Sequence, residues 1–225
     1  MKQNVIAIDG PAGAGKSTVA RQVAQQLGFI YVDTGAMYRA VTSRSLDLGL
    51  DPADAEAIGA LAARIDVRFV REGESLRVMA DGQDVTKQIR TPAVTAAVAQ
   101  VSQAPAVREA MVRLQRELAA AGRAVLDGRD IGTVVTPDAC CKIFLTASAG
   151  ERARRRWLEL RGKGYDPNLE ELRREMEQRD KQDSERELAP LVQAVDAVAI
   201  DTTGLTIEAV VDRIVAIYQD RMRRK

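Results

Sequence analysis

The chain has 225 residues, a length that suits one α/β domain with an insertion. Its 33 basic and 32 acidic residues give a formal net charge of +1, which offers no argument for binding nucleic acid or an anionic membrane. The sequence has no run of about 18 apolar residues to predict a membrane-spanning helix. It also has no histidine, which excludes a Ser–His or Cys–His nucleophile. We expect a monomer without a nucleic-acid or membrane partner.

The first elements alternate between strand and helix. Val19, Val23 and Leu27 recur at helical spacing, and Gly28 fits the left-handed residue that ends many helices. The patterns predict, in order, a strand at residues 4–9, a helix at 17–27, a strand at 29–33 and helices at 35–48 and 53–64. Such alternation is typical of a parallel sheet covered by helices.

The pattern changes at residues 65–89, where apolar and polar residues alternate in short runs. Asp81 and Gly82 form a dipeptide that is typical of a tight hairpin turn. The residues at 72–74 separate two of the runs in a similar way. We therefore expect a small antiparallel sheet inserted into the alternating chain.

The remaining residues return to the alternation of helices and strands. A helical pattern over residues 91–122 is interrupted at Pro105. The later elements are strands at 124–127, 142–146 and 195–201 and helices at 149–161, 168–183 and 207–222. The apolar side of the last helix is expected to carry Ile207, Val211, Ile214 and Ile217. Cys140 and Cys141 are adjacent in an apolar run, which favours core packing over metal binding and a location in the reducing cytoplasm.

A phosphate-binding motif follows the first strand and precedes the first helix. Residues 10–17 match the pattern G-x-x-x-x-G-K-[ST]. Glycines let backbone N–H groups turn toward phosphate oxygens, and the helix N-terminus adds unpaired donors. Lys16 is expected to reach the β- and γ-phosphates, and the Ser17 hydroxyl to bind Mg²⁺. We assign ATP binding to Gly10, Pro11, Ala12, Gly13, Ala14, Gly15, Lys16, Ser17 and Thr18.

The motif and the alternating elements together predict an α/β P-loop fold of three layers. Its parallel central sheet is flanked by helices, and the chain adds the inserted antiparallel sheet and a helical lid. We place the core at residues 1–34, 91–148 and 187–225. A second region is placed at 35–90, with the inserted sheet at about 65–89, and the lid with an adjoining helix at 149–186.

Three of the expected strands end in an aspartate, namely Asp9, Asp33 and Asp127. Ligands of open α/β sheets bind at the carboxyl ends of the strands, so these side chains are expected near the P-loop. Each of them could instead be a turn residue or a helix N-cap. We predict that Ser17 and Asp33 bind Mg²⁺.

Several arginines stand where packing does not require them. Arg39 follows Gly35 by about one helical turn and Arg129 follows a strand, so both could hold an acceptor phosphate with a fork of donors. The basic helix at 149–161 carries Arg152, Arg154, Arg155 and Arg156. These side chains fit either a solvated face or a mobile lid that brings positive charge to the transferring phosphoryl group. We predict catalytic roles for Lys16, Arg129, Arg152, Arg155 and Arg156.

Arg179, Asp183 and Arg186 are spaced i, i+4 and i+7, so they share one face if the helix continues that far. This spacing fits either a surface ion-pair ladder or a set of groups that bind a base and a ribose.

In combination, these motifs resemble the bacterial cytidylate kinases of the nucleoside monophosphate kinase group. The segments that carry the resemblance are residues 8–17, 33–39, 107–110, 127–135 and 142–145, and Arg179-Asp180 with Asp183 and Arg186. The match covers nearly the whole chain. The Asp-Gly-Arg-Asp segment with the later Arg-Asp-x-x-Asp-x-x-Arg pattern is far more specific than the P-loop.

The resemblance implies transfer of the γ-phosphoryl group of ATP to CMP or dCMP, with Mg²⁺ as cofactor, in pyrimidine nucleotide metabolism. It implies that the region at 35–90 binds the monophosphate and that the helix adjoining the lid binds substrate. The residues implied to bind CMP are Thr34, Arg39, Arg108, Arg129, Asp130, Arg179, Asp183 and Arg186. One departure is visible, because the family often has a cytosine-contacting serine where Ala99 stands. Ser102, one helical turn away, could replace it.

Two other classes stay open at this stage. A kinase of another small acceptor would share the P-loop but would not need the set formed by Arg179, Asp183 and Arg186. A switch-type GTPase would need an Asn-Lys-x-Asp motif for guanine, and the sequence has none.

Overall fold

The structure is a computed structural model, which describes residues 3–72 and 75–224. Its contacts divide the chain into two compact units. The first holds the described residues up to Tyr31 and from Ala119 onward, and the second runs from Val32 to Leu118. Residues 91–118, which we placed with the core, therefore pack within the second unit, while the predicted lid at 149–186 belongs to the first. Among the described residues, every helix is too short or too polar to span a bilayer.

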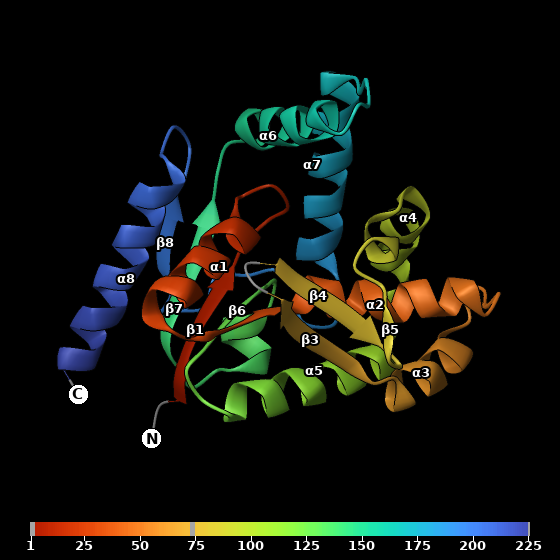
Figure 1. Cartoon of the computed structure of the whole chain (residues 1–225). Coiled ribbons are helices and arrows are strands. Elements are labelled where there is room, and N and C mark those ends of the chain that lie inside the picture. The colour runs from red at the N-terminus through yellow and green to blue at the C-terminus, as the bar shows by residue number, and fades with distance from the viewer. Residues whose placement is uncertain (1–2, 73–74, 225) are drawn as a thin grey trace. The chain divides into compact units, whose positions relative to one another are not determined.

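A five-stranded sheet forms the centre of the first unit (Figure 1). The strands are β1 (Gln3–Asp9), β2 (Ile30–Asp33), β6 (Ala124–Gly128), β7 (Ala139–Thr146) and β8 (Val198–Asp201). Their order across the sheet is β2-β6-β1-β7-β8, and β1 runs parallel to both β6 and β7. Residues 5–8 are completely buried, as expected for a strand covered on both faces. The predicted parallel central sheet is confirmed.

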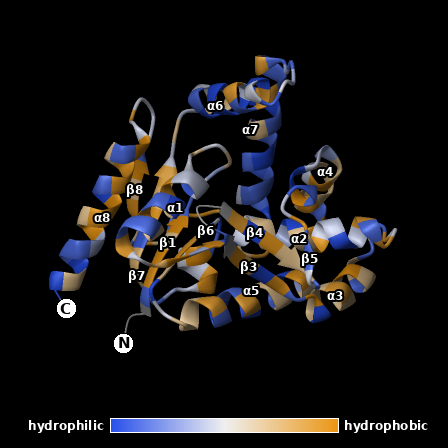
Figure 2. Ribbon diagram, viewed as in Figure 1, coloured by the Kyte–Doolittle hydropathy of each residue, from blue (hydrophilic) through white to orange (hydrophobic). Residues whose placement is uncertain are grey.

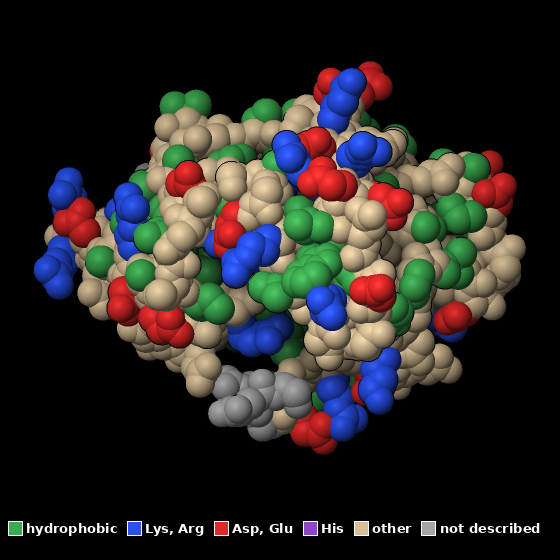
Figure 3. All heavy atoms as spheres, turned by 90° about the horizontal axis from the view of Figure 1, so that it is seen from above, with side chains coloured by type: hydrophobic (Ala, Val, Ile, Leu, Met, Phe, Trp, Pro, Cys, Tyr) green, Lys and Arg blue, Asp and Glu red, His purple; other side chains and the backbone are tan. Residues whose placement is uncertain are grey.

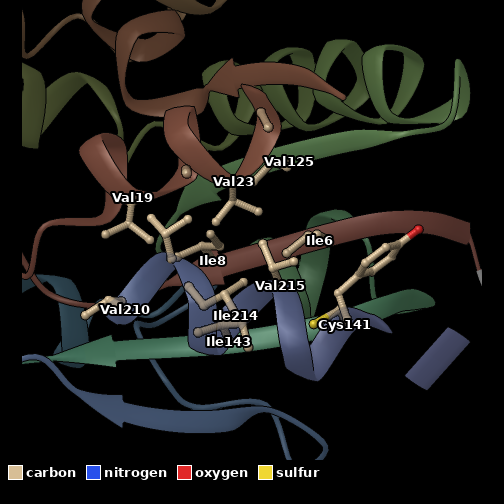
Figure 4. Close-up of a cluster of buried hydrophobic side chains, with 14 of the residues drawn as sticks. Ile6, Ile8, Val19, Val23, Val125, Cys141, Ile143, Val210, Ile214 and Val215 are labelled. Atoms are coloured by element: carbon tan, nitrogen blue, oxygen red, sulfur yellow. The ribbon is translucent and has the colours of Figure 1, made fainter. Parts of the chain in front are cut away.

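Helices α1 (Lys16–Leu27) and α8 (Ile207–Arg223) pack on the sheet and enclose an apolar cluster (Figure 4). Val19 and Val23 of α1 and Ile214 of α8 lie against the strand residues Ile6 and Ile143 in this cluster. The helices α6 (Ala149–Gly162) and α7 (Leu169–Glu185) differ from these, because their residues are mostly hydrophilic (Figure 2). Only Met176 of α7 is buried among its described residues.

The second unit combines four helices with the inserted sheet. The helices are α2 (Thr34–Asp47), α3 (Ala55–Arg64), α4 (Pro92–Val101) and α5 (Pro105–Ala120), with a 3-10 turn η1 (Gln88–Arg90) before α4. The strands β3 (Val67–Glu72), β4 (Ser75–Ala80) and β5 (Gln83–Asp84) pair in antiparallel fashion, as predicted. Asp81 and Gly82 join β4 to β5 with φ angles of 50° and 78°, which is the conformation of a tight hairpin turn. The predicted separator at 72–74 falls partly outside the described residues.

Two strands begin at residues other than those predicted from the sequence, and one predicted apolar residue of α8 lies outside its packed face. Strand β8 begins at Val198 and not at Val195, which is fully exposed, because a turn from Ala194 to Ala197 precedes the strand. Strand β7 begins earlier than predicted, at Ala139. Ile207 is 42% exposed and does not belong to the apolar side of α8, because it is the first residue of the helix, beyond the packed turns.

Candidate nucleotide-binding site

The predicted P-loop connects β1 to α1, and its conformation depends on glycine. Gly10 has a φ of 147° and Gly13 a φ of 76°. A Cβ atom on Gly10 would overlap the carbonyl oxygen of Leu145, and one on Gly13 would lie 2.5 Å from Cε of Met176. Helix α1 begins at Lys16, so its first N–H groups face the end of this loop. The strand–loop–helix context that the motif requires is present.

Lys16 is buried, with 6% of its surface exposed, and its Nζ donates a hydrogen bond of 2.7 Å to the Pro11 carbonyl oxygen. Burial lowers the pKa of Lys16 well below its usual 10.5, and the charge of Arg129 acts in the same direction. Asp127 opposes this shift. The side-chain nitrogen of Lys16 is thus held over the P-loop at the N-terminus of α1, where the motif predicts that phosphates bind.

Ser17, in the first turn of α1, and Asp127, in β6, place a hydroxyl and a carboxylate side by side. The Ser17 hydroxyl donates to Oδ2 of Asp127 at 2.8 Å, and Asp127 is only 4% exposed. The hydroxyl of Tyr31 donates to the other oxygen, Oδ1, at 2.9 Å. Hydroxyl and carboxylate oxygens are ligands that Mg²⁺ prefers, so the chemistry of this pair fits the ion. Within the described ranges, no group of three or more acidic, Cys or His residues is arranged to hold a metal.

Asp33, the second residue predicted to bind Mg²⁺, lies in the second unit and caps helix α2. Its Oδ1 accepts a hydrogen bond of 2.9 Å from the backbone N–H of Ala36. This is the N-cap role that the sequence left open. A metal-binding role for Asp33 stays a prediction.

Asp9 supports the loop that follows β6. Its two carboxylate oxygens accept hydrogen bonds of 2.8 Å from the N–H groups of Ile131 and Gly132. These residues begin η2 (Ile131–Val135), a short π-helical turn. Burial raises the pKa of Asp9 to about 6 despite these hydrogen bonds, and Asp130 adds to the rise.

Four of the five predicted CMP-binding residues of the first unit form two ion pairs. Arg129 Nε donates to Oδ2 of Asp183 at 2.7 Å, and Arg186 Nη2 lies 3.5 Å from Oδ1 of Asp130. Burial acts to raise the pKa of Asp183, but the charge and hydrogen bond of Arg129, together with the charges of Arg179 and Arg186, outweigh burial, and the pKa is lowered. The structure therefore brings the loop after β6 and the end of α7 together.

The spacing of Arg179, Asp183 and Arg186 does not place all three on one helical face. Helix α7 ends at Glu185, and Arg186 is its C-cap, with extended backbone. Its Nε donates to the carbonyl oxygen of Ala189 at 2.5 Å. The condition that the helix continue to Arg186 is not met, although Arg186 still reaches Asp130.

The four arginines singled out on α6 differ in burial and in their partners. Arg152 is 6% exposed and donates to the Ala12 carbonyl oxygen of the P-loop at 3.0 Å, while Asp180 pairs with it at 2.5 Å. Arg155 donates to the Thr202 hydroxyl at 3.0 Å. A Cβ atom on Gly15 would lie 3.7 Å from Nη1 of Arg155. Two of the predicted arginines therefore lie against the P-loop.

The other two arginines singled out on this helix fit the solvated face that the sequence left open. Arg154 is exposed and Arg156 partly exposed, and each forms an ion pair with a glutamate of its own helix. Arg156 Nη1 lies 2.7 Å from Glu159. A catalytic role for Arg156 stays a prediction.

Three predicted CMP-binding residues lie within the second unit. Arg39 donates to the Thr95 hydroxyl at 2.9 Å, and the guanidinium of Arg108 lies over the ring of Tyr38 at 5.7 Å. Thr34 is buried at the first position of α2. Ser102 was expected to supply the cytosine contact that a serine at position 99 would make. Its hydroxyl donates to the carbonyl oxygen of Ala99 at 3.0 Å.

Two neighbours of the site were not singled out from the sequence. Tyr31 precedes Asp33 by two residues in β2, and no motif marks it. Asp180 belongs to the Arg-Asp-x-x-Asp-x-x-Arg pattern, but the pattern predicts no role for it. Its contact with Arg152 spans 28 positions of the sequence. Partners so far apart in sequence leave no local signal.

Comparison with known proteins gives a consistent result. The family model described as cytidylate kinase matches residues 6–220. The cytidylate kinase of Desulfitobacterium hafniense is 51% identical over 223 residues, which cover 99% of this chain and 96% of that protein. The cytidylate kinase of Geobacter sulfurreducens is 49% identical over 219 residues, with coverages of 97% and 94%.

Two further matches show how the chain relates to larger proteins and to solved structures. A bifunctional pantoate ligase/cytidylate kinase of Synechococcus elongatus is 51% identical over 225 residues, but the match spans only 43% of its length. A crystal structure of an uncharacterized protein from Eubacterium ventriosum aligns with a TM-score of 0.52 at 13% identity, covering 96% of this chain and 99% of that one. This likeness concerns the fold alone.

Proposed function

Since this chain belongs to the cytidylate kinase family, we propose that it transfers the γ-phosphoryl group of ATP to CMP, giving ADP and CDP, with dCMP as a second acceptor. The observation that carries the proposal is the match at about half identity over nearly the full chain, together with the P-loop geometry. The reaction belongs to pyrimidine nucleotide metabolism. Two buried free cysteines fit a protein of the reducing cytoplasm, and we take it to be a monomer.

ATP is proposed to bind at the P-loop of the first unit. The N–H groups at the start of α1 and the ammonium of Lys16 supply positive charge for its phosphates. Arg152 and Arg155 lie against the same loop, which supports a role in neutralising the transferring group. The remaining proposed catalytic groups are Arg129 and Arg156.

CMP is proposed to bind through arginines and aspartates. In the first unit these are Arg129, Asp130, Arg179, Asp183 and Arg186, and in the second Thr34, Arg39 and Arg108. The pairing of Arg129 with Asp183 and of Arg186 with Asp130 supports this proposal, because paired groups are held in fixed orientations before the ligand arrives. Arginine forks suit a phosphate, and carboxylates suit ribose hydroxyls.

Mg²⁺ is proposed to be held by the Ser17 hydroxyl and the Asp127 carboxylate, with phosphate oxygens completing its shell. Bound there, the ion would neutralise charge on the β- and γ-phosphates. Asp33 is the further residue that the sequence proposes for this role.

The proposed reaction needs no general base. The acceptor is a phosphate oxygen of CMP, which is already ionised at neutral pH, and the chain has no histidine to take a proton. Rate acceleration then comes from positioning the two phosphates and from the positive charge of Lys16 and the arginines. Exclusion of water protects ATP from hydrolysis during this step.

A phosphotransfer assay with ATP and Mg²⁺ over a panel of CMP, dCMP, UMP, AMP and GMP tests the proposal. We expect CMP and dCMP to be the preferred acceptors. A preference for AMP, or the absence of any nucleotide acceptor, would overturn the proposed function. Turnover of a non-nucleotide acceptor would favour the kinase of another small molecule.

A further inference from the structure

The carboxylate of Asp127 is held from two sides by hydroxyl groups of different elements. Ser17, in the first turn of α1, donates to Oδ2 at 2.8 Å. Tyr31, in β2, donates to Oδ1 at 2.9 Å. Asp127 itself is buried in β6, and its two donors are partly buried.

This arrangement fixes how the carboxylate is turned. The last torsion of an aspartate side chain is soft and broadly distributed, so burial alone does not set its orientation. A hydrogen bond to an ionised oxygen is short and strong, and one at each oxygen removes the remaining freedom. With Tyr31 bound to Oδ1, the other oxygen is directed to Ser17.

Tyr31 is in turn held in place by its surroundings. Strand β2 is the neighbour of β6 in the sheet, which brings the tyrosine beside Asp127. The guanidinium of Arg21 lies over its ring at 5.7 Å from the ring centre. The strand position and the contact with Arg21 therefore hold the Tyr31 hydroxyl in place to donate to Asp127.

We propose that Tyr31 is a positioning residue for the Mg²⁺ of the bound nucleotide, acting through the carboxylate of Asp127. The inference rests on the proposed function, in which Ser17 and Asp127 face that ion. Outer partners of metal-binding groups orient them, and their loss commonly lowers metal affinity by about 10- to 100-fold. Tyr31 contributes no bond to nucleotide or metal in this role.

The test is Tyr31→Phe, which removes one hydroxyl and keeps the ring. Calorimetry measures the affinity for ADP in excess Mg²⁺ and again in EDTA, and the ratio of the two is the gain due to Mg²⁺. We expect the variant to lose about tenfold of this gain. Its affinity for ADP in EDTA should stay within about twofold of the wild type, because the P-loop donors are untouched.

Two further variants separate positioning from damage. Tyr218→Phe is the matched control, since Tyr218 also loses a 2.9 Å hydrogen bond, in this case to Asn4 and not to Asp127. Its Mg²⁺ gain should equal that of the wild type. In an Asp127→Asn background, Tyr31→Phe should have no further effect on the gain, because Tyr31 acts through the carboxylate.

An unchanged Mg²⁺ gain in Tyr31→Phe would overturn the inference, as would an equal loss of ADP affinity with and without Mg²⁺. An effect of the same size in Tyr218→Phe would also contradict it. These measurements use no acceptor. Failure of the wild-type protein to phosphorylate CMP would therefore reject the proposed function without deciding the role of Tyr31.

Discussion

At the scale of single residues, Lys16 shows a conflict between stability and chemistry. Its ammonium is removed from water and bonded to a backbone carbonyl of the P-loop. Burial lowers the pKa of Lys16, and the like charges of Arg129 and Arg179 lower it further. A group kept in such surroundings is expected to weaken the folded state in return for its position near phosphates.

We predict that Lys16→Met raises the melting temperature and lowers kcat by at least about 100-fold. Replacing a buried charge with an apolar side chain of similar length is often stabilising, whereas loss of one preorganised charge at a transferring group costs about 10²–10³ in rate. Thermal unfolding and steady-state kinetics measure the two effects.

Lys142→Met is the matched control for this prediction. Lys142 is a buried lysine of β7 whose Nζ pairs with Asp196 at 2.8 Å, and it lies outside the P-loop. Its substitution should leave kcat within a fewfold of the wild type. Equal losses of kcat in both variants would show that burial of the lysine, and not its place in the loop, matters.

Asp9 gives a prediction about pH. Its pKa is raised from 3.8 to about 6 in the folded protein, so between these values the folded state binds a proton that the unfolded chain does not. The contribution of Asp9 to the free energy of unfolding is therefore full below about pH 4 and falls by roughly 3 kcal/mol as the pH rises through 6.

Asp9→Asn should remove this dependence, because the amide stays neutral at every pH. Urea unfolding at about pH 4 and about pH 7 measures the difference between variant and wild type. We expect that difference to shift in favour of the variant at the higher pH. Asp130 raises the pKa of Asp9, while Lys16 and the hydrogen bonds from Ile131 and Gly132 lower it. A parallel pair of stability curves would therefore mean that the lowering effects hold this pKa near its ordinary value.

The residues predicted from the sequence were those that belong to motifs. Residues 10–17 could be assigned because a strand, a glycine loop and a helix follow one another without a gap. Tyr31 and Asp9 could not, since their roles depend on hydrogen bonds to residues about 100 positions away. Such partners become visible only when the strand order is known.

At the scale of elements, Asp33 caps α2 and is also predicted to bind Mg²⁺, and one substitution separates the two roles. Asp33→Ser keeps an oxygen that can accept from Ala36, so the free energy of unfolding should change by less than about 1 kcal/mol. We expect a higher Mg²⁺ concentration for half-maximal kcat, because a carboxylate is lost. An unchanged Mg²⁺ requirement would reduce Asp33 to a helix cap.

Helices α6 and α7 are joined by the pair of Arg152 and Asp180. Both side chains are largely buried, with 7% and 20% exposed, and Arg152 also holds the P-loop at Ala12. Asp180→Asn leaves a buried guanidinium without its counter-charge, and we expect a loss of about 3 kcal/mol in the free energy of unfolding. The KM for ATP should rise with it.

Glu177→Gln is the control on the same helix. Glu177 pairs with Arg173 at 3.1 Å, and both are about half exposed, so its loss should cost less than about 1 kcal/mol. Urea unfolding of the two variants gives the comparison. Equal costs would show that the contact between α6 and α7 does not depend on the buried pair.

Most elements follow from local pattern, but some of their ends do not. The period of the apolar residues predicted α1, β6 and α8 to within one residue at both ends. The start of β8 was misplaced because the run before Val198 is apolar as well, and only the turn at Ala194 shows that it is not a strand. The end of α7 before Arg186 likewise depends on contacts with Ala189 and Asp130.

At the scale of the whole molecule, the parallel sheet was predictable and its order was not. Alternating strands and helices require parallel pairing, but β1 lies between β6 and β7, whose residues are more than 115 positions away. The two compact units divide the chain within β2 and again near the end of α5, and no change of composition marks either point.

The charges of the whole molecule are nearly balanced at +1, and the face in Figure 3 shows basic and acidic side chains interspersed. Several arginines of the proposed site are paired with carboxylates, so little net field extends into the solvent. Steering of an anionic nucleotide over long distances is therefore expected to be weak, although local contacts with its phosphates are strong.

We predict that the association rate constant for ADP falls by less than about tenfold when the ionic strength rises from about 0.01 M to about 0.1 M. Over that range the screening length shrinks from about 30 Å to about 10 Å, which removes long-range attraction but leaves short contacts. Stopped-flow measurement with a fluorescent ADP analogue gives the rate constant. Glu208→Lys, at the start of α8, changes the net charge from +1 to +3 and should alter the rate constant little. A fall of a hundredfold or more would show that the site arginines act as an unneutralised patch, which steers nucleotides to the P-loop in spite of the balanced total.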